Sequence, residues 1–230
     1  MMIDKGSRFF NFGTKYDIEK ANIENISNSS IATEYFDWQI RNFHPYLSGR
    51  VLEIGAGIGT ISQRLAKLAD TLVISDISDQ CIEIVRNRMK TENYTINIEY
   101  INYSLGAPTP DLFCHNPFDS IVCVNVLEHV EDDVMALRYL LEALSQKGRL
   151  LLLVPALKFL YGSTDRALGH YRRYKKKSIS EKLYRAGYEI EKIKYINFIG
   201  VFGWWFNCRV LKREIIPLST FRIFRCLFPF

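Results

Sequence analysis

Residues 51–65 read VLEIGAGIGTISQRL, so an apolar strand, three glycines and the start of a helix follow one another directly. Glycine has no Cβ, and closely spaced glycines let the backbone approach a bound ligand. The glycines are Gly55, Gly57 and Gly59, and Thr60 stands where a dinucleotide-binding fingerprint has its last glycine. The loop therefore predicts a nucleotide-like ligand without the usual pyrophosphate signature.

The next apolar stretch, TLVISD, ends in the acidic residue Asp76, 21 positions after Gly55. At the end of the second strand of a nucleotide-binding α/β unit, a carboxylate can accept hydrogen bonds from both hydroxyls of a ribose. Taken alone, Asp76 could instead cap a helix. Together with the glycine loop, it indicates a ligand that contains a ribose.

A regular alternation of short apolar strands and amphipathic helices follows Arg50. Such strands are typical of a parallel sheet that is covered on both faces. The pattern predicts a doubly wound, mostly parallel α/β fold, with ligands bound beyond the carboxyl ends of the strands. The expected strands are 50–54, 71–76, 97–103, 118–125 and 148–155; the expected helices lie within 29–47, near 60–69, and at 79–90, 132–146 and 178–187, with a further strand at 188–196.

Three segments resemble, in order and at family spacing, the successive motifs of class I S-adenosylmethionine-dependent methyltransferases. They are VLEIGAGIGTIS, LVISD and the long run FDSIVCVNVLEHVEDDVMALRYLLEALSQKGRLLLLVPA. The resemblance covers roughly residues 50–156. It implies a Rossmann-like sheet of the seven-stranded type, S-adenosylmethionine as the cofactor and S-adenosylhomocysteine as the product.

The resemblance also divides the chain into three parts. Residues 1–49 form an N-terminal arm and helix, 50–156 the cofactor-binding core, and 157–230 an acceptor-binding segment, the completion of the sheet and an aromatic, basic tail. Relatives close the sheet with an antiparallel seventh strand after this tail, and no such strand is evident before the sequence ends at CLFPF. Either the final strand is missing or an earlier segment fills that edge.

Carried over position by position, the resemblance implies roles in cofactor binding. The glycine loop packs against the methionine portion, Glu53 lies near its amino group, Asp76 holds the ribose and Ile77 flanks the adenine. Many relatives have an aspartate after the third strand for the adenine amino group, whereas Tyr103 and Ser104 stand there in this chain. The expected cofactor-binding residues are Glu53, Gly55, Ala56, Gly57, Gly59, Asp76, Ile77, Tyr103, Ser104, Asn125 and Leu127.

The segment YGSTDRALGHYRRYKKKS follows the fifth expected strand, where family members insert acceptor-binding elements. An oxygen acceptor needs a base near neutral pH, and histidine suits that role. We expect His170 to be the base, with His129 as the weaker candidate. Arginines recognise anionic groups bidentately, and tyrosine rings provide flat surfaces against which a ring or chain of the acceptor can pack. The expected acceptor-binding residues are Tyr161, Asp165, Arg166, Tyr171, Arg172 and Arg173; the alternative is a lid held by pairs between Asp165 and arginines.

These features predict a methyltransferase that acts on a small or lipid-linked acceptor at oxygen, with an anionic or sugar-containing acceptor as the best match. One alternative is a nucleic-acid methyltransferase, because residues 151–230 hold 16 basic and 5 acidic residues while residues 1–150 hold 14 and 20. Against it, NVLEHV stands where base-methylating enzymes have an Asn-Pro or Asp-Pro motif. The other alternative is a non-catalytic scaffold that retains the fold.

Composition places further limits on partners and location. The five cysteines have no metal-like spacing, so we expect reduced thiols, no metal site and a cytoplasmic protein. The longest apolar run, INFIGVFGWWF, is too short to span a bilayer. Beyond Pro217, aromatic and basic residues at helical spacing could pack against the protein or form a peripheral membrane contact.

Overall fold

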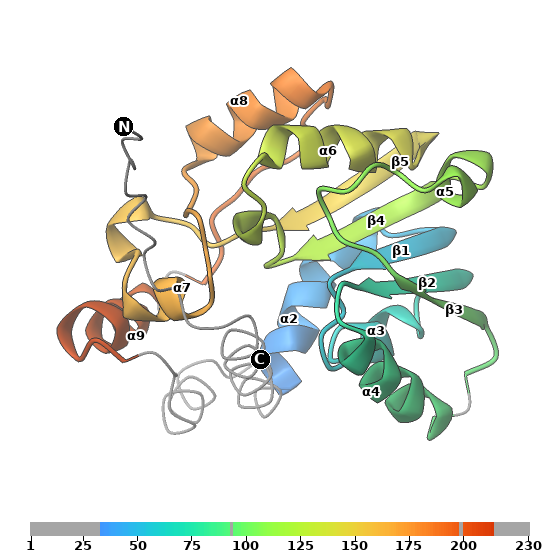
Figure 1. The fold of residues 1–230 in the computed structure, drawn as a ribbon, viewed down its shortest axis with the longest axis horizontal. Helices are drawn as coiled ribbons and strands as arrows, with labels where there is room; N and C mark the ends of the chain where they lie inside the picture. The colour runs from blue at the N-terminus through green and yellow to red at the C-terminus, as the bar shows by residue number, and fades with distance from the viewer. Residues whose placement is uncertain (1–32, 93, 198–199, 214–230) are drawn as a thin grey trace, which may run out of the picture.

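The computed structural model describes residues 33–92, 94–197 and 200–213. At its centre lies a five-stranded sheet in the order β3-β2-β1-β4-β5, in which every pair of neighbours is parallel (Figure 1). This confirms the doubly wound parallel fold expected from the sequence. The strands are β1 (Arg50–Ile54), β2 (Thr71–Asp76), β3 (Asn97–Asn102), β4 (Phe118–Val124) and β5 (Leu144–Leu153).

The central strand β1 sets the position of the candidate site. It pairs with β2 on one side and β4 on the other, so that Glu53 lies opposite both Ile74 and Val122. The connections lead from β1 outwards to β2 and β3, and then back across to β4 and β5. In such sheets a crevice opens at the carboxyl ends of the strands where the order reverses, which here is between β1 and β4.

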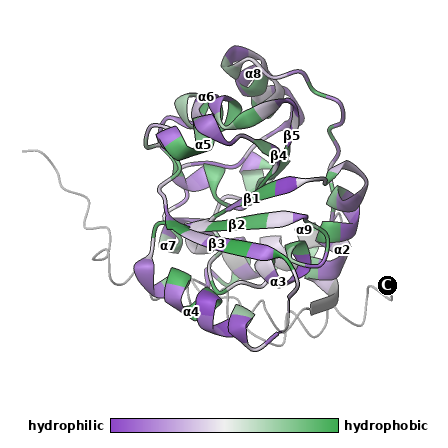
Figure 2. Ribbon diagram, turned by 90° about the vertical axis from the view of Figure 1, so that its right-hand side faces the viewer, coloured by the Kyte–Doolittle hydropathy of each residue, from purple (hydrophilic) through white to green (hydrophobic). Residues whose placement is uncertain are grey.

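Helices cover both faces of the sheet, as the apolar strand pattern requires. One core cluster joins the sheet to the side of α2, α3 and α4, and the other joins it to the side of α5, α6 and α8 (Figures 1 and 2). The helices are α2 (Thr33–Phe43), α3 (Ser62–Leu65), α4 (Asp79–Lys90), α5 (Asp111–His115), α6 (Asp133–Glu142), α7 (Ser163–Ala167), α8 (Lys176–Ala186) and α9 (Gly200–Trp205), with 3-10 turns at His44–Tyr46, Leu127–His129 and Lys158–Leu160 and a π-helical turn at Phe206–Val210.

Helix α4 illustrates how the sequence determines these elements. The side chain of Ser78 accepts a hydrogen bond from the backbone N–H of Cys81, which caps the first turn. The residues that α4 buries recur at helical spacing on one face, while its last turn is basic, as the helix dipole favours. Its buried residues are Cys81, Ile82, Val85 and Met89.

The expected strand at 188–196 was wrong. The structure has no strand there, although the segment lies near the core through a hydrogen bond from the Tyr188 hydroxyl to the carbonyl of Leu137. A strand persists only with a paired neighbour, and the described residues offer this segment none. The arm at 1–28 and the segment 217–230, for which a peripheral membrane contact is one expectation, lie outside the described residues.

Within the residues that the structure describes, no helix is both long and apolar enough to cross a bilayer.

Candidate active site

The glycine loop leaves β1 in a backbone conformation that side chains disfavour. Gly55, Gly57 and Gly59 have φ angles of +72°, +54° and +83°. A Cβ added to Gly55 would lie 2.3 Å from Cγ2 of Val126, in the loop after β4. Glycine is therefore required at position 55 both by the left-handed backbone and by the close approach of the two loops.

Asp76 connects this loop to β2. Its Oδ2 accepts a hydrogen bond from the backbone N–H of Gly57 at 2.8 Å, and its Oδ1 accepts one from Ser78 at 2.9 Å. Each carboxylate oxygen can accept more than one hydrogen bond, so these contacts are compatible with the expected ribose role. The structure thus brings together the two features that the sequence singled out.

Glu53 lies directly beneath the loop and is fully buried. Burial raises the pKa of its carboxyl group to about 8, and the negative charge of Asp76 adds to this effect. Its Oε2 has no hydrogen-bond partner among the described residues. A cationic group placed beside this carboxyl group would favour its ionised form, which fits the amino group of a bound methionine portion.

The remaining cofactor-binding candidates also follow the carboxyl ends of the strands. Ile77 is 62% exposed, as a residue that flanks an adenine should be. Asn125 is exposed with φ +53°, whereas the side chain of Leu127 is fully buried in the core. The ring of Tyr103 instead packs in the core and its hydroxyl donates to Ala107, so Ser104, which is half-buried, is the better side-chain candidate there.

The residues of this crevice therefore fit S-adenosylmethionine. The glycine loop has the left-handed backbone and the close approach to the loop after β4 that only glycine allows, the buried Glu53 has an unsatisfied oxygen, and Asp76 lies at the end of the neighbouring strand.

The segment that contains α7 lies beyond the carboxyl ends of β4 and β5 (Figure 1). At its centre, the carboxylate of Asp165 is completely buried and receives three hydrogen bonds. They come from the backbone N–H of Gly162 at 2.9 Å, Nδ1 of His170 at 2.9 Å and Nε of Arg173 at 2.7 Å. Hydrogen bonding outweighs burial here, since burial raises the pKa of Asp165 but its hydrogen bonds to His170 and Arg173 lower it below its usual range.

The structure adds a residue that the sequence did not single out, Glu128. Its Oε1 lies 4.0 Å from Nε2 of His170, and the rings of His129 and His170 meet edge to face with centroids 4.6 Å apart. Burial raises the pKa of Glu128 to about 8, whereas burial and the nearby His170 lower that of His129 to about 4. The only sequence signal for Glu128 was its place in the family motif after the fourth strand.

Ligand atoms of Glu128, His129 and His170 lie within 4.8 Å of one another, which meets the distance requirement for a shared cation. However, the positively charged guanidinium group of Arg173 is already close enough to Glu128 to oppose part of the pKa increase that burial causes. A second cation would be repelled by that group. The charge already present in the cluster therefore disfavours a metal ion.

Two of the arginines that were expected to hold an anionic acceptor have internal partners. Arg172 Nη1 lies 2.8 Å from Oδ2 of Asp133, and Arg173 pairs with Asp165. The second pair is the contact that the lid interpretation requires. Tyr161 donates from its hydroxyl to the carbonyl of His170 at 2.7 Å. Arg166 and Tyr171 are exposed.

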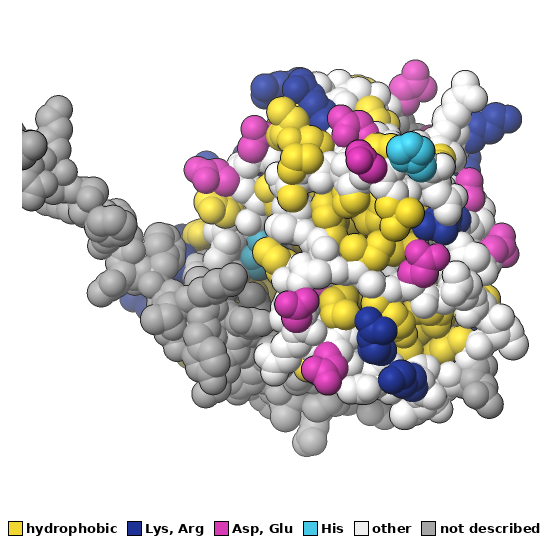
Figure 3. Space-filling model, turned by 45° about the vertical axis from the view of Figure 1, so that its right-hand side comes forward, with side chains coloured by type: hydrophobic (Ala, Val, Ile, Leu, Met, Phe, Trp, Pro, Cys, Tyr) yellow, Lys and Arg dark blue, Asp and Glu magenta, His cyan; other side chains and the backbone are white. Residues whose placement is uncertain are grey.

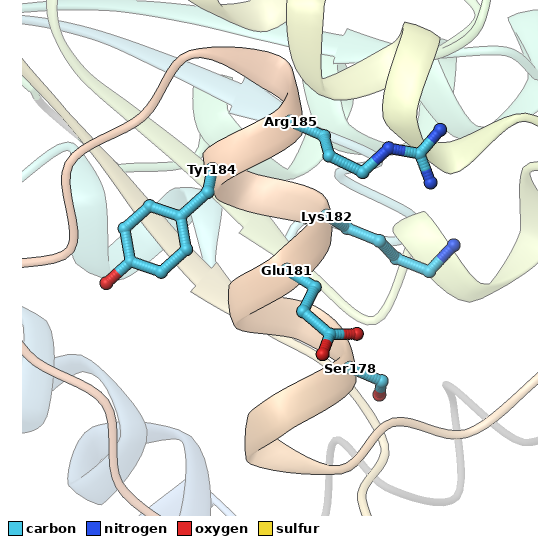
Figure 4. A pocket seen from close by; sticks show the side chains of 5 residues that line it. All are labelled: Ser178, Glu181, Lys182, Tyr184 and Arg185. Atoms are coloured by element: carbon cyan, nitrogen blue, oxygen red, sulfur yellow. The ribbon is translucent and has the colours of Figure 1, made fainter.

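A depression lies on the surface of α8. It is lined by side chains of that one helix, which diverge from one another (Figure 4). None of the expected site residues lines it; its lining residues are Ser178, Glu181, Lys182, Tyr184 and Arg185.

Comparisons with known proteins agree with this geometry. The chain is 30% identical over 130 residues to the mitochondrial ubiquinone biosynthesis O-methyltransferase of Schizosaccharomyces pombe, covering 56% of this chain and 44% of that protein. It is 32% identical over 107 residues to the ubiquinone/menaquinone biosynthesis C-methyltransferase UbiE of Hahella chejuensis, covering 45% and 41%. The chain thus spans less than half the length of the curated relatives that it matches.

The fold is also found among solved structures. The N-methyltransferase NodS of Bradyrhizobium japonicum, solved in complex with S-adenosylhomocysteine, superimposes with a TM-score of 0.52 at 21% identity, covering 66% of this chain and 72% of NodS. The sequence profile of the methyltransferase domain matches residues 28–193, more than two thirds of the chain. The chain therefore belongs to the methyltransferase domain family.

Proposed function

We propose that this chain binds S-adenosylmethionine in the crevice at the carboxyl ends of β1, β2 and β4 and transfers its methyl group to a small or lipid-linked acceptor. The observation on which this rests is the contact between the glycine loop and Asp76 at the carboxyl ends of β1 and β2, beside the point between β1 and β4 where the strand order reverses. When bound, the cofactor supplies a sulfonium methyl group and leaves as S-adenosylhomocysteine.

The proposed acceptor atom is oxygen. The curated relatives include both an O- and a C-methyltransferase of ubiquinone biosynthesis, so their names support a small-molecule acceptor of either kind. The distinguishing feature in this chain is His170, whose Nε2 receives no hydrogen bond from the described residues while Nδ1 is bonded to Asp165. A neutral imidazole with this arrangement can accept the proton that an alcohol or phenol loses.

Two surface features bear on the kind of acceptor. On the face shown in Figure 3, acidic and basic side chains are interspersed around apolar ones, without the single-sign surface that nucleic acids require. Near α9, Phe202, Trp205 and Phe206 are exposed beside Arg209. Exposed aromatics with an adjacent cation suit a lipid-linked acceptor or a membrane surface.

The experiment that tests the proposal uses S-adenosylmethionine with an isotopically labelled methyl group. The protein is incubated with fractionated cell extract, and label is followed into lipids, polar metabolites, protein and RNA. We expect label in the lipid or polar metabolite fraction, and much less of it with Asp76→Ala at a cofactor concentration below saturation. Label in RNA, or binding of the cofactor without transfer to any fraction, would contradict the proposal and favour the nucleic-acid or scaffold alternative.

A further inference from the structure

We propose that Asp165 is the positioning residue of His170: it holds the imidazole with its proton on Nδ1 and stabilises the imidazolium ion formed when Nε2 accepts a proton. This inference rests on the proposed function, in which His170 is the base. It assigns to Asp165 a role distinct from the acceptor binding expected from the sequence.

The first step of the argument concerns the tautomer. Nδ1 of His170 lies 2.9 Å from Oδ1 of Asp165. An ionised carboxylate can only accept hydrogen bonds, so Nδ1 must be the protonated nitrogen. In neutral imidazole the other nitrogen then has a lone pair, and Nε2 is able to act as a base.

The second step concerns the rigidity of Asp165. Its Oδ2 accepts from the backbone N–H of Gly162 and its Oδ1 accepts from Nε of Arg173, in addition to the bond from His170. Arg173 is itself restrained, because its Nη1 donates to the carbonyl of Ala156 and its guanidinium lies 4.8 Å from the centre of the Trp204 ring. The carboxylate is therefore fixed in direction, as a positioning group must be.

The third step concerns the charges that face His170. Asp165 and Arg173 form one buried ion pair, Glu128 lies on the Nε2 side of the ring, and the ring of His129 meets that of His170 edge to face. Burial favours the neutral forms of Glu128 and His129. The nearest negative charge for an imidazolium ion at position 170 is therefore that of Asp165. Asparagine at 165 would remove that charge and could donate to Nδ1, which selects the wrong tautomer.

The test combines turnover with nuclear magnetic resonance of the histidine side chains. In the wild-type protein labelled with 15N-histidine, we expect the His170 signals to show protonated Nδ1 and unprotonated Nε2 near neutral pH, assigned by their loss in His170→Gln. In Asp165→Asn, we expect the kcat of methyl transfer to fall at least about a hundredfold, which is the lower end of the range for general-base catalysis. The pH profile of the residual activity should differ from that of the wild type.

Asp119→Asn is the matched control. Asp119 is an exposed aspartate that accepts from the backbone N–H of Arg50 at the amino end of β4, far along the strand from the site. It should retain wild-type turnover, and cofactor affinity measured by calorimetry verifies that each variant is folded. If Asp165→Asn does not fold, the tautomer in the wild-type protein decides the proposal alone.

Three results would overturn the inference: a wild-type His170 protonated at Nε2, an Asp165→Asn protein with unchanged turnover and pH profile, or stoichiometric binding of a divalent cation through Nε2. A wild-type protein that shows the expected tautomer but transfers no methyl group would contradict the proposed function instead. The nuclear magnetic resonance spectra therefore distinguish failure of the inference about Asp165 from failure of the proposed function.

Discussion

Asp76 contributes to the crevice through its carboxylate, which receives backbone hydrogen bonds at 2.8 Å and 2.9 Å. We expect Asp76→Ala to weaken S-adenosylmethionine binding by at least about tenfold, because a hydrogen bond to a charged group contributes about 1.5–3 kcal/mol. Isothermal titration calorimetry measures the change. Asp76→Asn preserves the shape of the side chain, so its affinity for S-adenosylmethionine should lie between those of the wild type and Asp76→Ala.

The matched control for this prediction is Asp70→Ala. Asp70 is exposed and precedes the same strand at its amino end, on the opposite edge of the sheet. Its substitution should leave the affinity unchanged. Equal affinities of Asp76→Ala and Asp70→Ala would show that the carboxylate at position 76 does not contact the ligand.

Glu53 predicts a pH dependence of stability in the ligand-free protein. Its folded-state pKa of about 8 lies above the ordinary value of 4.5. Between these two values the folded state retains a proton that the unfolded state loses, so stability falls as pH rises, by at most about 1.4 kcal/mol per pH unit. Glu53→Gln lacks this contribution.

The measurement is urea unfolding of both proteins from pH 5 to pH 9. We expect the stability of Glu53→Gln relative to the wild type to rise across this window and to level off above pH 8. A constant difference would mean that Glu53 titrates normally. Any titration of Glu128 is common to both proteins and cancels in the comparison.

At the scale of an element, helix α8 is capped after Ala186 by Gly187, whose φ is +103°. The backbone N–H of Tyr188 donates back to the carbonyl of Leu183 at 3.0 Å, which closes the last turn. An alanine at position 187 must adopt the left-handed conformation, at a cost of about 1–2 kcal/mol. Its Cβ would also lie 3.0 Å from Cδ2 of Leu141.

We therefore expect Gly187→Ala to lower the free energy of unfolding by at least about 1 kcal/mol, as measured by chemical denaturation. Gly187→Asn is the control, since asparagine introduces the same Cβ but tolerates the left-handed backbone better. It should lose less stability than alanine. Equal losses would assign the effect to the contact with Leu141 rather than to the backbone.

Most of the elements could be predicted from local sequence. Most strands are apolar runs, and α4 begins and ends where its cap and its periodicity predicted, at Asp79 and Lys90. The boundary between α6 and β5 was wrong, since the helix expected at 132–146 ends at Glu142 and β5 already begins at Leu144, in a polar stretch. The strand expected at 188–196 failed for a non-local reason. Its alternating pattern fits an edge strand, but pairing depends on a neighbour elsewhere in the chain.

The candidate site likewise has one part that local sequence predicts and another that depends on contacts between distant residues. Asp165, His170 and Arg173 are close in sequence, and the segment was predicted as a unit. Glu128 and Asp133 come from the region after β4, and only the sheet topology brings them against that segment. Sequence spacing could not show that Arg172 and Arg173 would find buried carboxylates inside the protein rather than in an acceptor.

At the scale of the whole molecule, the segment after β5 is joined to the cofactor-binding core by buried acids. Asp133, at the start of α6, accepts from Tyr174 and pairs with Arg172 and with Lys182 of α8. The backbone N–H of Tyr171 donates to the carbonyl of Glu128 at 2.8 Å. The segment that contains α7 and the loop after β4 are thus one connected unit, so events in the crevice can influence the stability of both.

Ligand binding should therefore stabilise the molecule as a whole. At a concentration one hundred times its Kd, S-adenosylhomocysteine should raise the free energy of unfolding by about 2.7 kcal/mol, or Tm by roughly 5–10 °C for a domain of this size. NAD and ATP should give no shift at equal concentration, because Thr60 replaces the glycine that a pyrophosphate site requires. Differential scanning calorimetry measures all three ligands on one preparation. A shift with NAD and none with S-adenosylhomocysteine would mean that the glycine loop and Asp76 hold a dinucleotide, since in that case the stabilising ligand must place a pyrophosphate at the start of α3.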